Sequence, residues 1–556
     1  MNSVAPIERK NKIALVVILI LLNTYFFQHY DNIPNPNEQS RIYLVTAIVD
    51  NHRLSIDEQI KRFGDTIDIS RYNGKAYCDK APGLSFLGVP FYAFLKLLSK
   101  VFDFTLTYPL ILKFLRTLLL SIPSAFFSLI MLSILQRYTK DFQLSLVMTI
   151  FYSLGTIAFT YSNLLFGHQL GAIFVFVLFY LITHYSEGRG IVLFLSGLVA
   201  GYSVVIEYPL ILIAAVLSIY QFIVLKNRWR FLYFILGGLI PAIILLAYNH
   251  YAFGSILSTG YAHIANPTFA QFHKEGIMGV TTPKLGALVG SLFSSMRGIF
   301  YFMPLLIFSF FGLVLMIRDS DTKSSGIIIG IITLLMIYFI SSFSYWQAGG
   351  TISQRHLTAL IPFLIIPTAI ALKSLVENEI FLVFVFASAL MLFSLIMIPY
   401  ATIPFPFFST VYPNPLFELP LNLWHWGAIP INAGNVLSLR GLDSAIPFLV
   451  LWIPLLCYAV FLLLSLYRGR VSAFLGSILT ICITFLLISG ASFIARENNY
   501  ESKMKDVIGI VENFKPGRNS CEFVIDGKSN RFDRVTCYTF LKRGADAVKS
   551  IREATR

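Results

Sequence analysis

The sequence predicts an all-α polytopic membrane protein, and two observations carry that prediction. First, 56% of the 556 residues are hydrophobic and only 13% are charged, with a mean hydropathy of +0.71, whereas about a quarter of a soluble domain is charged. Second, long apolar stretches recur at 13–27, 231–247, 327–340 and 381–398. They approach the ~20 apolar residues that a helix needs to cross a bilayer. The surplus apolar surface therefore needs lipid as its solvent.

The positive charge of the chain predicts its orientation in the membrane. The formal net charge is +14, and much of the excess lies in short loops between apolar stretches, as the positive-inside rule describes. This pattern favours a membrane topology and gives no reason to expect nucleic-acid binding. The basic groups are Arg9/Lys10/Lys12, Arg137/Lys140, Arg189, Lys226/Arg228/Arg230, Arg318/Lys323, Lys373 and Arg468/Arg470. Placing all of them in the cytoplasm predicts about thirteen transmembrane helices, with the N-terminus cytoplasmic and the C-terminus outside a prokaryotic cell membrane.

The chain divides into two predicted parts. Residues 1–495 form a transmembrane domain, and its first apolar stretch is expected to be retained because no small-residue cleavage site follows it. Residues 496–556 form a small external α+β tail. Cys521 and Cys537 flank a predicted hairpin turn in that tail. A disulfide between them and two free thiols are evenly weighted alternatives.

The first predicted external loop, about residues 28–101, is long, polar and rich in ionisable side chains. Asn35 and the proline after it have the pattern of a helix start, and apolar residues three and four apart follow, so juxtamembrane helices are expected. The loop then brings Asp65, Asp68 and Lys80 toward the next apolar run. The cytoplasmic loops are too short for a nucleotide-binding domain, and neither a Walker A pattern nor a dinucleotide fingerprint is present.

Several residues of this loop form a spaced pattern: Glu38, Arg41, Gly74, Lys75, Tyr77, Lys80 and Pro82. The pattern resembles the first loop of the GT-C superfamily of polyprenyl-phosphate-sugar-dependent glycosyltransferases, which includes protein O-mannosyltransferases and lipid A aminoarabinose transferases. Those proteins carry an acidic pair, then an arginine, then a Gly-Lys-x-Tyr-x-x-Lys-x-Pro segment. Asn37 stands here at the first acidic position, so the chain departs from the family at the residue often assigned as the base. Weaker likenesses to uncharacterised members lie at 166–168, 296–300, 346–350 and 354–357.

The resemblance implies transfer of a sugar, with inversion, from a polyprenyl phosphate to an acceptor hydroxyl on the extracytoplasmic side. Such a reaction needs a carboxylate that takes the hydroxyl proton and cations that stabilise the departing phosphate. Glu38 is the first candidate for the base, although a glutamate at this helical position can instead close a capping box. Asp65, Asp68 and Asp79 are alternative bases or simple turn residues. Glu207, at the end of an apolar stretch, is a second carboxylate for sugar hydroxyls or an interfacial residue that reaches water.

The phosphate-binding candidates are Lys80, Arg297 and Arg355, because all three lie at predicted external ends of helices. The alternative for each is a cation that extends to the lipid headgroups. The supporting or sugar-binding candidates are Arg41, Asp65, Asp68, Tyr77, His168, Glu207, Tyr345, Trp346 and His356. Their aromatic members fit an interfacial belt as well.

No cofactor or metal site is predicted, although the carboxylates of Asp65 and Asp68 are compatible with a divalent cation. The expected partners are a polyprenyl-phosphate-linked sugar donor, a glycan, lipid or protein acceptor, and membrane lipids. One rival function is an O-antigen ligase or polymerase, which would not need a carboxylate in the first loop. Another is a transporter or flippase of lipid-linked sugars. Transporters commonly show two corresponding halves, and no such repeat is found in this sequence.

Overall fold

The structure is a computed structural model that describes residues 4–25, 27, 35–185, 189–349 and 351–376. The predicted tail at 496–556, with Cys521 and Cys537, lies outside these residues, as do the spans expected after residue 376.

Helices make up most of the described chain, and two strands form a hairpin. The α-helices are α1 (Val4–Tyr25), α2 (Pro36–Asn51), α3 (Asp57–Phe63), α4 (Gly83–Val101), α5 (Tyr108–Arg116), α6 (Ile122–Thr139), α7 (Phe142–Gly155), α8 (Ile157–Tyr161), α9 (Gly167–His184), α10 (Gly190–Ile206), α11 (Ile211–Val224), α12 (Phe231–Phe253), α13 (Pro267–Lys274), α14 (Leu285–Phe293), α15 (Ile299–Phe302), α16 (Phe308–Arg318), α17 (Lys323–Ser342) and α18 (Ile361–Val376). The short 3₁₀ or π segments are η1 (Thr117–Ser121), η2 (Tyr208–Leu210), η3 (Arg228–Arg230), η4 (Gly260–His263), η5 (Pro304–Ile307) and η6 (Arg355–Leu360). The strands are β1 (Ile69–Tyr72) and β2 (Lys75–Cys78).

Six helical stretches of the described chain are long and apolar enough to cross a membrane: Gly83–Val101, Tyr108–Thr139, Gly167–His184, Arg228–Phe253, Lys323–Ser342 and Arg355–Ser374. Together with the composition, they make the chain a multi-pass membrane protein. The first of them, α4, falls inside the predicted first external loop at 28–101. The prediction for that loop did not count this apolar run as a span, but its 19 residues meet the length and hydropathy of one.

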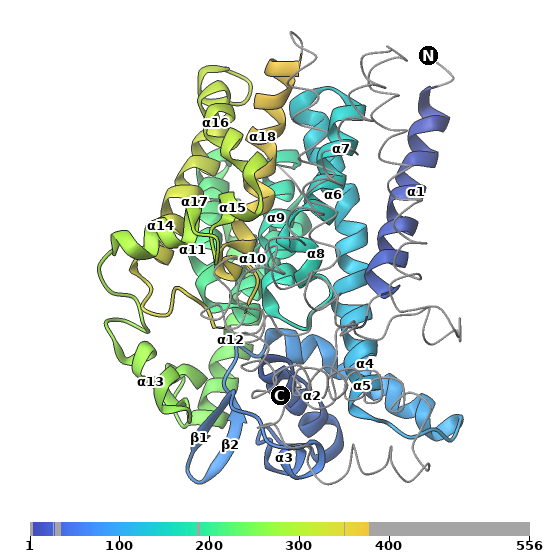
Figure 1. Cartoon of the computed structure of the whole chain (residues 1–556), viewed down its shortest axis with the longest axis vertical. Helices are drawn as coiled ribbons and strands as arrows, with labels where there is room; N and C mark the ends of the chain where they lie inside the picture. The colour runs from blue at the N-terminus through green and yellow to red at the C-terminus, as the bar shows by residue number, and fades with distance from the viewer. Residues whose placement is uncertain (1–3, 26, 28–34, 186–188, 350, 377–556) are drawn as a thin grey trace, which may run out of the picture.

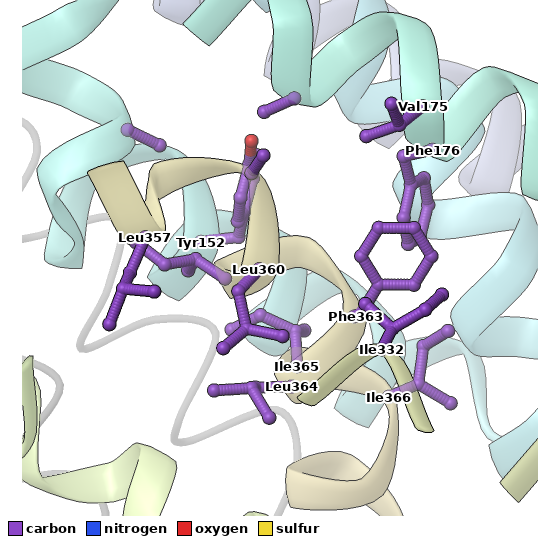
Figure 2. Close-up of a cluster of buried hydrophobic side chains, with 14 of the residues drawn as sticks. Tyr152, Val175, Phe176, Ile332, Leu357, Leu360, Phe363, Leu364, Ile365 and Ile366 are labelled. Carbon is purple, nitrogen blue, oxygen red and sulfur yellow. The ribbon is translucent and has the colours of Figure 1, made fainter. Parts of the chain in front are cut away.

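Buried apolar side chains gather around α18 near the centre of the bundle. Its Phe363 packs edge-on against Phe176 and Phe179 of α9, with ring centroids 5.3 and 5.6 Å apart. Tyr152 of α7 and Ile332 of α17 belong to the same cluster (Figure 2). Because η6 leads directly into this buried helix, the residues at the start of η6 are held in place by the core.

Glycines bring α10 and α12 into close contact. A methyl group built on Gly197 would overlap the carbonyl oxygen of Phe234, and one built on Gly237 would overlap the carbonyl oxygen of Phe194. Small residues commonly allow helix backbones in membranes to approach in this way. The contact fixes α10, and Glu207 follows directly at its end.

The N-terminus of α2 forms as predicted. The side chain of Asn35 accepts a hydrogen bond of 3.1 Å from the backbone N–H of Asn37, with Pro36 at the first helical position. The apolar stripe of this segment suggested a juxtamembrane helix with one face in water, but every side chain from Asn37 to Ala47 is buried. The helix packs against α3, α4, α5 and β2, which cover the face expected to meet water.

The β-hairpin turns at Asn73 and Gly74, which both have positive φ angles of 48° and 76°. Such a pair is typical of a two-residue hairpin turn. The backbone N–H of Ala265 donates to the carbonyl oxygen of Ile69 (2.9 Å) and joins the hairpin to the segment after η4. The hairpin, α2, α3 and α13 lie together at one end of the bundle (Figure 1), so the polar residues of the first loop gather there.

Candidate active site

A cavity of about 440 Å³ collects side chains from segments that are far apart in the sequence. It is lined by residues of α2, of the segments before β1 and after β2, and of α9, η2, α11, α17 and η6. Nine of the candidate site residues that the sequence indicated line it: Arg41, Asp68, Asp79, Lys80, His168, Glu207, Tyr345, Arg355 and His356. Carboxylates and cations from distant parts of the chain therefore share one chamber.

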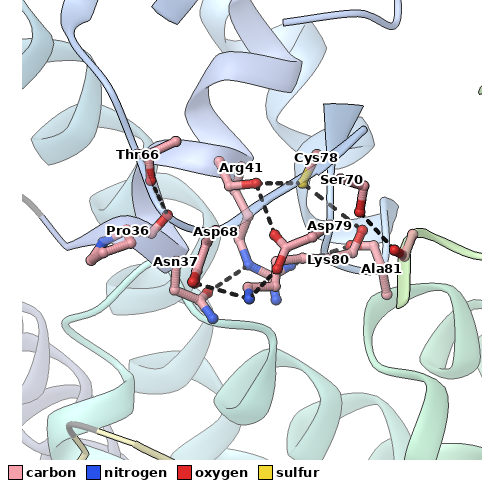
Figure 3. A network of polar contacts seen from close by, with 12 residues as sticks. Pro36, Asn37, Arg41, Thr66, Asp68, Ser70, Cys78, Asp79, Lys80 and Ala81 are labelled. Carbon is pink, nitrogen blue, oxygen red and sulfur yellow. Dashed lines mark hydrogen bonds and ion pairs between the residues drawn. The ribbon is translucent and has the colours of Figure 1, made fainter. Parts of the chain in front are cut away.

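Lys80 lies between two carboxylates in this cavity (Figure 3). Its Nζ is 2.9 Å from Asp68 Oδ2 and 2.6 Å from Asp79 Oδ2. Burial alone lowers the pKa of Lys80, but the two carboxylates outweigh it and raise the pKa above the usual lysine value, so the ammonium stays charged. Ser40 donates to Asp79 Oδ1 (3.1 Å). Burial, with Asp68 nearby, raises the pKa of the Asp79 carboxyl despite the lysine.

Asp68 and Asp79 differ in how much of each carboxylate remains available. Both oxygens of Asp79 have a partner, and its side chain is only 3% exposed. Asp68 is bound through Oδ2 alone, its side chain is 12% exposed, and its Oδ1 has no partner in the part of the chain that the structure describes. Asp68 is therefore the better placed of the two to accept a proton from a molecule in the cavity.

A third carboxylate, Glu207, lines the cavity beside Arg41. Glu207 Oε1 accepts a hydrogen bond of 2.9 Å from Arg41 Nη2 and lies 3.8 Å from His168 Nδ1. Gly167 leaves the space for it, because a methyl group built there would overlap the carboxylate. Arg41 also donates from Nε to Asn37 Oδ1 (3.1 Å), another residue of the cavity wall.

Arg355 and His356 bring polar atoms to the cavity that lack partners among the described residues. The Nε of Arg355 and the Nε2 of His356 are both buried without a hydrogen bond. The Arg355 guanidinium lies 5.8 Å from the ring centroid of Phe166, and the ring of His356 meets that of His168 edge-on at 5.6 Å. A buried polar atom without a partner is costly, so these two atoms are suited to a polar ligand.

Aromatic side chains from the segment between α12 and α14 form another part of the wall. Tyr261 stacks on His273, with ring centroids 4.6 Å apart, and Tyr345 packs against Phe272 at 5.0 Å. Tyr261, His273 and Tyr345 all line the cavity. Burial, and then the charge of Lys80, lower the pKa of His273 to about 4, so its imidazole is neutral near pH 7.

One flank of the cavity is apolar and belongs to the membrane-spanning part of the molecule. Ile211 and Leu212 of α11 and Leu335, Tyr338 and Phe339 of α17 line it. Ile211 is 55% exposed and Tyr338 is 56% exposed. The polar chamber is therefore continuous with apolar side chains that also reach the outer surface of the bundle.

The structure does not bring Glu38 to the cavity, and its assignment as the first candidate base is not retained. Its side chain is 1% exposed and forms a two-point ion pair with Arg116: Arg116 Nε donates to Oε1 (2.8 Å) and Nη2 to Oε2 (2.5 Å). The backbone N–H of Leu165 also donates to Oε1 (2.5 Å). Both oxygens are therefore engaged inside the protein.

Arg297 likewise does not line the cavity. Its guanidinium donates to the backbone carbonyl oxygens of Met296, Gln347, Gly349 and Thr351. These bonds direct it toward the loop before η6, where phosphate binding would have to replace several of them. We therefore do not retain Arg297 as a phosphate ligand.

Three further candidates lie outside the cavity wall. Asp65 is exposed, Tyr77 packs against Phe253 with ring centroids 5.5 Å apart, and Trp346 fills the space above Gly290. In contrast, sequence reasoning missed Tyr261 and His273. Their segment carries no motif, and only the fold brings it over the cavity.

No known protein family and no curated protein matches the chain. The structure is similar to the crystal structure of ArnT from Cupriavidus metallidurans bound to undecaprenyl phosphate, with 14% sequence identity and a TM-score of 0.43. The match covers 89% of this chain and 78% of that one.

Proposed function

We propose that this protein is a membrane glycosyltransferase that moves a sugar from a polyprenyl phosphate to an acceptor hydroxyl on the extracytoplasmic side of a prokaryotic cell membrane. The observation that carries the proposal is the cavity in which Asp68, Lys80, Glu207 and Arg355 meet beside an apolar flank. The resemblance of the first loop to the GT-C superfamily names the class of donor. The acceptor is a glycan, a lipid or a protein.

Lys80 and Arg355 are the proposed ligands of the donor phosphate. Arg355 carries a buried Nε without a partner in the described chain, and a guanidinium is suited to bind phosphate oxygens through parallel hydrogen bonds. Lys80 stays charged between its carboxylates and contributes a point charge. Both would stabilise the negative charge that grows on the phosphate as the sugar leaves.

Asp68 is the proposed base, in place of Glu38. The acceptor oxygen forms a bond to the anomeric carbon while the bond from that carbon to the phosphate oxygen breaks. The phosphate leaves with the electron pair of that bond, and the hydroxyl proton passes to Asp68 Oδ1. Inversion at the anomeric carbon follows from this single displacement. Arg41 is not assigned to the phosphate, because each of its guanidinium nitrogens already donates within the protein, whereas the Lys80 ammonium has three N–H donors and two carboxylate partners.

The apolar flank between α11 and α17 is suited to the isoprenoid chain of the donor. Ile211, Leu335 and Tyr338 extend from the cavity toward the lipid-facing surface of the bundle. A headgroup can therefore reach the polar chamber while its chain stays among apolar side chains, where its burial is favourable.

The proposal is tested by donor turnover in membranes from cells that produce the chain, since these membranes supply the acceptor. Labelled undecaprenyl-phosphate-linked glucose, mannose, galactose and arabinose are offered, and the release of undecaprenyl phosphate is measured. We expect turnover of at least one donor and a loss of about 10²- to 10⁴-fold in Asp68→Asn.

Asp65→Asn is the matched control, because Asp65 is an exposed aspartate three residues away that does not line the cavity. It should keep turnover within a few-fold of the unmodified chain. Failure to cleave any donor, or full turnover in Asp68→Asn, would overturn the proposal. Movement of an intact donor across the bilayer without cleavage would favour the transporter alternative.

A further inference from the structure

Two sets of polar groups in the cavity differ in their chemistry. One set, Lys80, Arg355 and His356, offers positive charge and buried nitrogen atoms. The other set is Asn37, Arg41, His168 and Glu207, which we call the Glu207 cluster. It comes from α2, α9 and the end of α10, and all four members line the cavity.

The Glu207 cluster is not built to bind a phosphate. Each nitrogen of the Arg41 guanidinium already donates within the protein: Nε to Asn37 Oδ1 (3.1 Å), Nη1 to the carbonyl oxygen of Ala81 (3.3 Å) and Nη2 to Glu207 Oε1 (2.9 Å). Arg41 is 1% exposed. Its charge is therefore compensated, and its role is to hold Asn37 and Glu207 at fixed positions.

Those positions leave one acceptor and one donor for a ligand. Glu207 uses Oε1 for Arg41, whereas Oε2 has no partner within the described part of the chain. Asn37 accepts from Arg41 through Oδ1, so its amide N–H₂ group is the part left to the cavity. The carboxylate oxygen can accept a hydrogen bond and the amide can donate one. This pair is suited to a hydroxyl group, because a hydroxyl both donates and accepts hydrogen bonds.

His168 connects this cluster with the proposed phosphate-binding groups. Its Nδ1 is 3.8 Å from Glu207 Oε1, and its ring meets that of His356 edge-on at 5.6 Å. A sugar joined to a phosphate at Arg355 and His356 can therefore lie along His168 with its hydroxyls toward Glu207. Gly167 is needed for this arrangement, since any side chain there would displace the Glu207 carboxylate.

We propose that Glu207 and Asn37 bind hydroxyl groups of the sugar being transferred and so determine which sugar the protein accepts. This inference rests on the proposed function. A site that hydrogen-bonds a substrate hydroxyl rejects a sugar in which that hydroxyl is missing or inverted, because the buried polar groups then remain unpaired.

The test compares binding of undecaprenyl phosphate without a sugar to binding and turnover of the four sugar-linked donors. In Asn37→Ala, which leaves the ion pair between Arg41 and Glu207 in place, we expect unchanged affinity for undecaprenyl phosphate. The ratio of kcat/KM between the best and the poorest donor should fall by about 10- to 100-fold in Glu207→Gln, which loses a hydrogen bond to a charged group, and by about 2- to 10-fold in Asn37→Ala, which loses a neutral one. Glu207→Asp, which keeps the charge, should retain part of the discrimination.

Asn37→Ala keeps the ion pair of Glu207 with Arg41, so it answers the question even if Glu207→Gln is unstable. The inference is overturned if these variants keep the donor preference of the unmodified chain, or if Asn37→Ala loses affinity for undecaprenyl phosphate as much as for the sugar-linked donors. A different result would overturn the proposed function itself: an Arg355→Ala variant whose affinity for undecaprenyl phosphate is unchanged.

Discussion

The ion pair between Glu38 and Arg116 gives a prediction that separates folding from catalysis. The two side chains are 1% and 3% exposed, and two hydrogen bonds of 2.8 and 2.5 Å join them. Removing one partner of a buried pair leaves the other charge without compensation, which costs about 3–5 kcal/mol. Because proteins are commonly stable by only about 5–15 kcal/mol, Glu38→Gln should lower the thermal midpoint of the purified protein clearly.

The sugar-transfer reaction should be little affected by Glu38→Gln. Glu38 does not line the cavity, so turnover per folded molecule of Glu38→Gln should stay within a few-fold of the unmodified chain. The double variant Glu38→Gln/Arg116→Met removes both charges and should recover part of the lost stability. Glu58→Gln is the control: Glu58 is 53% exposed and paired with Lys61, and an exposed pair of this kind contributes about 0–1 kcal/mol.

Two measurements check this account, namely the thermal midpoint in detergent and the donor turnover of the fraction that remains folded. A Glu38→Gln variant with a normal midpoint and a hundredfold loss of turnover would refute it. Glu38 would then act in the reaction, as the sequence motif first indicated.

Three further predictions follow from the described residues. Gly197→Ala should lower the thermal midpoint and the yield, because the methyl group would overlap the carbonyl oxygen of Phe234, whereas Gly330→Ala has open space and should be tolerated. The pKa of His273 is about 4 in the folded chain and about 6.5 in the unfolded chain. Between these pH values the unfolded chain binds one more proton, so the free energy of unfolding falls as the pH drops. A plot of the thermal midpoint against pH should therefore be flatter in this range for His273→Gln. Chelation of divalent cations should leave donor turnover unchanged, because the Lys80 ammonium already occupies the space between two carboxylates. A loss of turnover on chelation that added Mg²⁺ restores would contradict this prediction.

The features that the sequence could predict are those that short segments determine. Asn35 caps α2 because the capping residue and the bond it accepts are two positions apart. Lys80 reaches the cavity because it follows the hairpin directly. The Asn73-Gly74 pair is a further local signal, because these residues are typical of a two-residue hairpin turn.

The features that the sequence could not predict depend on contacts between distant segments. Glu38 and Arg297 carry the charges that the chemistry needs, yet the structure binds them to Arg116 and to backbone carbonyl groups far along the chain. Arg297 and Arg355 look alike as arginines near predicted helix ends. They differ because backbone oxygens accept hydrogen bonds from the Arg297 guanidinium, whereas Arg355 Nε has no partner among the described residues. This difference depends on how the loop before η6 folds.

Locating the bound phosphate is the direct test of the proposed transferase site. A cryo-electron microscopy map of the full chain with undecaprenyl phosphate should place the phosphate within hydrogen-bond distance of Lys80 and Arg355, with the isoprenoid chain between α11 and α17. A phosphate bound outside this cavity, or one that contacts neither cation, would contradict the proposed transferase site.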